Sequence, residues 1–137
     1  MAGLARFGVS IEDELLKKFD RLIQQEGYLN RSEAIRDLIR KNLVEKEWGE
    51  KGDVAGGIVI VYNHEKRELV NKIIDIQHNF HEIIISSQHV HLDKQNCLEV
   101  IIVKGEAKRI GKLADTLHSL KGIKHCTLAR ATTGKEL

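Results

Sequence analysis

The chain has 137 residues, of which 42% are hydrophobic and 31% charged, and apolar runs such as residues 58–62 are far too short to cross a bilayer. The net charge is +2, and the first 53 residues carry 10 basic against 11 acidic side chains, which excludes a generally basic nucleic-acid-binding surface. With no evident secretory signal and only Cys97 and Cys126, we expect a cytoplasmic protein without disulfide bonds and without a membrane partner.

Side chains alternate between apolar and polar along residues 5–11, which predicts a short strand. A lone strand cannot satisfy its own backbone groups, so we expect it to pair with the same strand of a second chain. Such a ribbon fits the major groove of DNA, with Arg6, Gly8 and Ser10 on its outer face. Arg6 can pair with guanine and Ser10 can bond to several bases, whereas Gly8 offers only backbone. A plain edge strand, or Ser10 as a helix N-cap with Asp13 completing a capping box, are the structural alternatives.

Two helices are expected next. Apolar residues recur at helical spacing from Ile11 to Ile23, and Gly27 can end this helix in the left-handed conformation. Asn30 is the candidate N-cap of a second helix, whose apolar stripe continues toward Trp48. The two helices also allow a helix-turn-helix interpretation, in which residues 30–40 would read the DNA.

The segment 49–57 is rich in glycine and charge, so we place a linker there and expect domains at residues 1–50 and 51–137. Beyond the linker the pattern predicts strands and helices in the order βαββαβ, at residues 58–62, 65–78, 82–92, 97–104, 106–120 and 123–131. That order is typical of the ferredoxin-like fold, an antiparallel sheet with two helices on one face. The predicted fold class is therefore α+β.

Alternation along strand 82–92 places His89 and His91 on the same face. Whether Cys97 joins them depends on register, because a one-residue slip reverses every side chain. An even hairpin loop, pairing Leu92 with Cys97, would turn the thiol away. An odd loop, pairing His91 with Cys97, would gather both histidines, Cys97 and Glu99 on one face and predicts a metal site. The competing interpretation is a half-exposed strand that carries polar imidazoles without function.

A fourth ligand is needed, and His78 is the first candidate, ahead of His81, His64 and His125; spacing leaves open whether it comes from the same chain. Three nitrogens and a thiolate suit tetrahedral zinc, or planar Ni(II) or Cu(II). Four protein ligands leave no position for substrate, and no catalytic constellation is present, so we do not expect an enzyme. Glu99 is better suited as a hydrogen-bond acceptor behind the ligands.

Motifs in both halves of the chain resemble those of the nickel-responsive regulator family. They are residues 27–37 (GYLNRSEAIRD), 63–67 (NHEKR), Gln77-His78, His89-Val90-His91 and Cys97-Leu98-Glu99. The resemblance implies a ribbon-helix-helix (βαα) domain fused to an ACT-like ferredoxin fold, assembled as a dimer of dimers. It also implies a nickel-responsive repressor that binds a palindromic operator in double-stranded DNA, with nickel-uptake genes as the expected targets.

Carried over residue by residue, the resemblance makes His89, His91 and Cys97 the ligands from one subunit. His78 from a neighbouring subunit would complete square-planar Ni(II), with one ion per subunit. A zinc or copper sensor on the same scaffold, and a repressor whose ACT-like domain binds an amino acid, remain alternatives.

For DNA binding, the resemblance assigns base contacts to Arg6 and Ser10, while Gly8 departs from the small hydroxyl residue common between them. Lys66 and Arg67 match residues that contact the DNA backbone in the nickel-bound form. Glu33 and Asp37, four residues apart on one helix, resemble a secondary cation site between the domains.

Overall fold

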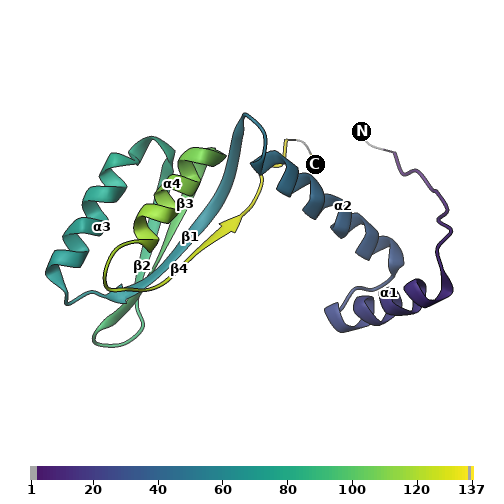
Figure 1. Ribbon diagram of the computed structural model, residues 1–137, viewed down its shortest axis with the longest axis horizontal. Coiled ribbons are helices and arrows are strands. Elements are labelled where there is room, and N and C mark those ends of the chain that lie inside the picture. The colour runs from purple at the N-terminus through teal and green to yellow at the C-terminus, as the bar shows by residue number, and fades with distance from the viewer. Residues whose placement is uncertain (1–2, 136) are drawn as a thin grey trace. The chain divides into compact units, whose positions relative to one another are not determined.

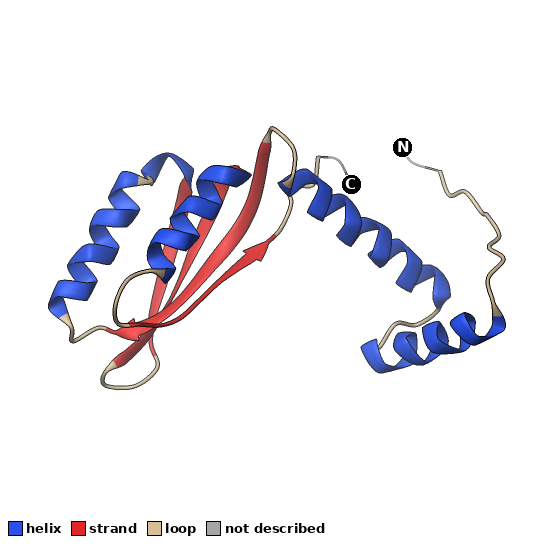
Figure 2. Ribbon diagram, in the orientation of Figure 1, coloured by secondary structure: helices blue, strands red, loops and turns tan. Residues whose placement is uncertain are grey.

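The computed structural model describes residues 3–135 and 137. Internal contacts divide the chain into two compact units, Met1–Lys41 and Asn42–Leu137. Figure 1 shows the elements in chain order, and Figure 2 shows their secondary structure. None of the helices within the described residues is long and apolar enough to cross a membrane.

The first unit contains α1, which spans Asp13–Glu26, and the beginning of α2, which spans Arg31–Trp48 and ends in the second unit. Gly27 ends α1 with φ of 77°, a left-handed conformation that favours glycine, as predicted. The side chain of Asn30 accepts a hydrogen bond from the backbone N–H of Glu33 at 2.9 Å, which confirms Asn30 as the N-cap of α2.

Residues 3–12 form neither a helix nor a strand in the single chain. The predicted strand at residues 5–11 needs a second copy as its hydrogen-bonding partner, so the inter-chain ribbon remains a prediction. The alternative in which Ser10 caps α1 is wrong, because the helix begins at Asp13 with Glu12 in the N-cap position.

The second unit contains a four-stranded antiparallel sheet with the strand order β2-β3-β1-β4. Two helices cover one face of this sheet (Figure 2). The strands are β1 (Asp53–Asn63), β2 (Ile84–His91), β3 (Asn96–Glu106) and β4 (Ile123–Arg130), and the helices are α3 (Arg67–Asn79) and α4 (Ala107–His118). A short 3-10 turn, His81–Ile83, precedes β2. The predicted βαββαβ order is confirmed.

The core lies between the sheet and the two helices. Burial alternates residue by residue along β1, so that one face packs inward and the other stays partly accessible. Strand residues such as Ile58, Ile60 and Ile101 meet Ile73 of α3 and Leu113 of α4, and each of these five is at most 1% exposed. Burying such aliphatic side chains stabilises a unit of this size by roughly 1.5–3 kcal/mol each.

The predicted linker at residues 49–57 is wrong in its second half, because β1 begins at Asp53. Gly56 and Gly57 lie inside this strand. A Cβ atom at Gly56 would approach the carbonyl oxygen of Ala129 to 2.6 Å and the ring of Trp48 to 3.4 Å. Trp48 also donates a hydrogen bond from Nε1 to the carbonyl of Ala131 at 2.8 Å. Gly56 is therefore required because β4 and Trp48 pack closely against the strand at this position. The glycine-rich composition alone had suggested a loop.

Candidate metal centre

The β2–β3 hairpin places three of the four predicted ligands on one face of the sheet. His91 pairs with Cys97 and His89 pairs with Glu99, so the connecting loop has an odd number of residues, 92–96, and all four side chains share one face. The odd-loop prediction is confirmed. Asp93 fixes the loop, because its carboxylate accepts hydrogen bonds from the backbone N–H groups of Asn96 and Gln95, which lower the pKa of Asp93 to about 2.

The four side chains differ in burial. Cys97 is fully buried and Glu99 is 5% exposed, whereas both histidines are exposed at the edge strand. Burial raises the pKa of the Cys97 thiol, and hydrogen bonding with Tyr62 partly opposes this effect. The site therefore has a buried sulfur behind two accessible imidazoles.

Glu99 is held from two sides. Its Oε1 accepts a hydrogen bond from the Tyr62 hydroxyl at 2.8 Å, and its Oε2 accepts one from the Gln77 side-chain amide at 2.6 Å. Burial, together with hydrogen bonds to Cys97 and Glu99, raises the pKa of Tyr62 well above its usual range. This carboxylate thus links β1, β3 and α3, and it reaches the helical residue next to His78.

His64 adds a contact that the sequence did not reveal. Its ring stacks on that of His91, with centroids 4.4 Å apart and planes 14° from parallel, while the His89 and His91 centroids are 5.5 Å apart. The backbone N–H of His64 donates to the carbonyl of Gln95 at 2.9 Å. His64 was only a reserve candidate for the fourth ligand; the pairing of Asn63 with Asn96 is what carries it to the hairpin.

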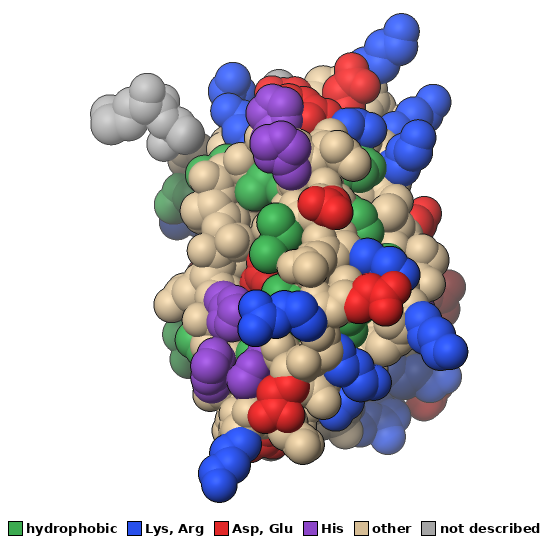
Figure 3. Space-filling model, turned by 90° about the vertical axis from the view of Figure 1, so that its left-hand side faces the viewer, with side chains coloured by type: hydrophobic (Ala, Val, Ile, Leu, Met, Phe, Trp, Pro, Cys, Tyr) green, Lys and Arg blue, Asp and Glu red, His purple; other side chains and the backbone are tan. Residues whose placement is uncertain are grey.

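His78 lies apart from these rings. Its ring pairs with that of His81, at 6.1 Å between centroids. Figure 3 shows histidine side chains in two separate groups on one face. Across residues 3–135 and 137, no three His, Cys, Asp or Glu side chains are close enough in the single chain to hold a metal ion. The hairpin therefore presents a partial donor set.

The N-terminal segment carries the other predicted site. Arg6, Gly8 and Ser10 are all exposed, and so are the alternating apolar side chains, with Phe7 71% and Val9 62% accessible. Large apolar side chains left accessible in a regular alternation are typical of a surface that another chain covers.

Family models match both halves of the chain. Residues 5–46 match the ribbon-helix-helix protein, copG family, and residues 55–131 match the NikR C-terminal nickel-binding domain. Relatives that carry the name nickel-responsive regulator are 57% identical in Pyrococcus furiosus, 56% in Thermococcus onnurineus and 53% in Syntrophus aciditrophicus. The alignments cover 98% of this chain and 98–99% of each relative. The chain belongs to the nickel-responsive regulator family.

This family consists of regulators that pair a DNA-binding ribbon-helix-helix domain with a nickel-binding domain, and it is not a family of enzymes. A solved structure of an uncharacterized protein from Thermotoga maritima matches 58% of this chain and 98% of its own length. Its TM-score is 0.53 at 16% identity, a likeness of fold alone.

The donor set suits the metal that gives the nickel-responsive regulators their name. Imidazole and thiolate are ligands that Ni(II) accepts, and the hairpin offers two imidazoles and one thiol on one face. The two imidazoles are accessible at the sheet edge, which leaves room beside them for a further ligand from outside the chain.

The other residues singled out from the family resemblance lie outside this hairpin. Lys66 and Arg67 are exposed at the start of α3. Glu33 accepts a hydrogen bond from Arg36, and Asp37 accepts one from Tyr28 and pairs with Lys41. Both carboxylates of the expected secondary cation site therefore have partners within the chain.

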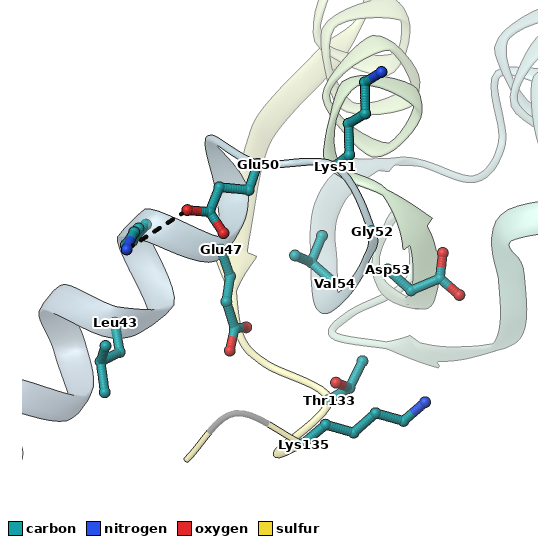
Figure 4. A pocket seen from close by; sticks show the side chains of 10 residues that line it. Leu43, Glu47, Glu50, Lys51, Gly52, Asp53, Val54, Thr133 and Lys135 are labelled. Carbon is teal, nitrogen blue, oxygen red and sulfur yellow. Dashed lines mark ion pairs between the residues drawn. The ribbon is translucent and has the colours of Figure 1, made fainter.

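A separate pocket of about 410 Å³ lies beside the beginning of β1 (Figure 4). Lysine and carboxylate side chains line it, including Lys46, Glu47, Glu50 and Lys135, with no histidine or cysteine among the described lining residues. Asp53 at this pocket and Asn63 near the hairpin are opposite ends of β1. The pocket is distinct from the candidate metal centre.

Proposed function

We propose that this nickel-responsive regulator is a nickel-dependent repressor. His89, His91 and Cys97 of one subunit and His78 of the partner subunit would hold one nickel ion per subunit. The loaded protein would bind a palindromic operator more tightly, with nickel-uptake genes as its targets. The observation that carries the proposal is the hairpin register, which sets His91 opposite Cys97 with His89 on the same face.

The position of His78 supports a site shared between subunits. His78 lies in the last turn of α3, just before the turn into β2, whereas His89 is five residues along that strand from Ile84. At about 3.3 Å per residue, those five residues alone span roughly 17 Å. Figure 1 shows the hairpin at the end of the sheet opposite to the α3–β2 turn. This separation along the sheet supports a partner subunit, and not the same chain, as the source of His78.

The chain's own residues prepare the site. Cys97 must lose its proton to bind the metal, and hydrogen bonding with Tyr62 favours that loss because it lowers the pKa of the thiol. Glu99 anchors Tyr62 and Gln77 behind the ligands, as carboxylates commonly do in metal sites. When bound, nickel supplies a fixed positive centre that ties donors from two chains together.

DNA recognition would follow dimerisation. Pairing of residues 5–11 between two chains would cover Phe7 and Val9 and leave Arg6 and Ser10 facing the major groove. Two such dimers would associate through the second unit, and this association would form the metal sites shared between subunits. Lys66 and Arg67, exposed at the start of α3, would then add contacts to DNA phosphates.

The function is tested by measuring operator affinity with and without nickel at one fixed salt concentration, because phosphate contacts make affinity depend on salt. We expect nickel to tighten binding by wild type and by C126A, and to have no effect on C97A. Cys126 is a matched control, since it is a half-buried thiol on β4 of the same sheet. An unchanged affinity in wild type, or an equal nickel response in C97A, would contradict the proposal.

A further inference from the structure

We propose that His64 is a positioning residue that couples the metal centre to the DNA-contacting residues Lys66 and Arg67. It would do so by stacking on His91, without binding the metal itself. The inference rests on the proposed function. It adds a path by which metal binding at the hairpin would affect the N-terminal end of α3, where Lys66 and Arg67 lie.

The first support is the stack. The two imidazoles lie nearly parallel, 14° apart, with centroids separated by 4.4 Å. The ring of His91 packs against one face of the ring of His64. Any change that fixes the His91 ring therefore restricts the movement of the His64 ring. His64 is half-buried, with its Nε2 atom enclosed by the protein.

The second support is the backbone on either side of that ring. The N–H of His64 donates to Gln95 in the hairpin loop at 2.9 Å, so the segment is tied to the loop between His91 and Cys97. In the same segment, the N–H of Lys66 donates to the carbonyl of Asn63 at 3.2 Å, and the carbonyl of Lys66 accepts from Val70 at 3.1 Å. Residues 63–66 thus connect the hairpin directly to the first turn of α3.

The third support is distance. From His78 to Lys66 a signal would have to pass along twelve residues of α3, about 18 Å at 1.5 Å per residue. His64 is two residues from Lys66 and is in direct contact with His91. The shorter path makes the His64 stack the more direct link between the metal and the two cations.

The orientation of His64 argues for a role other than metal ligation. Two imidazoles stacked face to face direct their ring nitrogens along nearly parallel planes, so their lone pairs do not converge on one ion. For the choice of a test variant, the relevant atom is Nε2 of His64, which is buried without a hydrogen-bond partner among the described residues. Replacing His64 with phenylalanine would therefore break no hydrogen bond at that atom and would keep an aromatic ring against His91.

The experiment compares full-length H64A and H64F with wild type and with H118A, in which an exposed histidine at the end of α4 is removed. Three properties are measured: the nickel-thiolate absorption band with nickel affinity, the nickel-dependent gain in operator affinity, and hydrogen exchange of residues 63–70 in the metal-free protein. The last readout requires no nickel.

For H64A we expect an unchanged absorption band, faster exchange at residues 63–70, and a loss of about 5-fold or more in the nickel-dependent gain. For H64F and H118A we expect all three properties to match wild type. An unchanged gain in H64A, a lost absorption band in H64A, or failure of H64F to restore the gain would each overturn the inference. Absence of any nickel-dependent gain in wild type would instead refute the proposed function on which the inference rests.

Discussion

His91 lies directly opposite Cys97 across the antiparallel β2–β3 pair. The five residues between them form a loop fixed by the carboxylate of Asp93. A shift of one residue in this pairing would turn the thiol to the other face of the sheet, away from both imidazoles. The register is thus the structural condition for a metal centre at this edge.

Removing the Tyr62 hydroxyl should weaken both the fold and the metal site. In Y62F the buried Glu99 carboxylate loses one of its two hydrogen-bond donors, which costs about 1–3 kcal/mol in free energy of unfolding. We expect nickel affinity to fall by roughly 10-fold or more, since such supporting partners tune ligands. Chemical unfolding and calorimetric nickel titration measure the two effects. Y28F, which removes a tyrosine hydroxyl that is bonded to Asp37 in the first unit, should leave nickel affinity unchanged.

The ribbon model predicts that Arg6 carries operator choice. R6A should lower affinity for the operator by about 1–3 kcal/mol and leave binding to unrelated DNA nearly unchanged, because the side chain would read a base edge. R36A on α2 is the matched control, since the helix-turn-helix alternative places specificity on that helix. If R36A relaxes sequence preference and R6A does not, the ribbon model is wrong.

Lys66 and Arg67 should act on affinity without affecting specificity. A cation that contacts a phosphate releases a counterion, so each of K66A and R67A should reduce the slope of log affinity against log salt by about 1. The effect should occur only in the nickel-loaded protein. K72A, a lysine further along α3 that pairs with Glu68, serves as the control. Equal slopes for all four proteins would exclude these phosphate contacts.

Acid should remove one stabilising interaction of the first unit. Two hydrogen bonds from Arg31, both at 2.9 Å, hold the pKa of Asp20 below its usual range. A lowered folded-state pKa stabilises the fold above the unfolded pKa of about 3.9, and that stabilisation is lost as pH falls through the folded value. Thermal unfolding should therefore separate wild type from D20N at pH 7 and show little difference near pH 2. A difference that persists in strong acid would contradict this explanation.

Much of the fold follows from the sequence pattern, and the exceptions have physical causes. The period of apolar residues predicted the two helices of the N-terminal half and the order of strands and helices along the second unit, and Gly27 and Asn30 marked helix ends correctly. The linker was extended too far because Gly56 looks like a loop residue, although it is required where Trp48 and β4 approach the strand.

The candidate site was predictable only in part. Alternation placed His89 and His91 on one face, but the position of Cys97 depended on a loop register that the sequence left open. The stack of His64 on His91 depends on the pairing of β1 with β3, a contact between segments distant in sequence. The pattern of residues within one segment of the sequence does not predict such a contact.

The central claim, a metal site shared between subunits, is tested most directly by mixing two inactive variants. H78A and C97A should each lack the nickel-thiolate absorption band as pure assemblies. After they are unfolded and refolded together, mixed assemblies can combine the intact hairpin of an H78A chain with His78 of a C97A chain. The account predicts that the band returns in the mixture. If the mixture lacks the nickel-thiolate absorption band, as its two components do, while refolded wild type recovers the band, the account is contradicted.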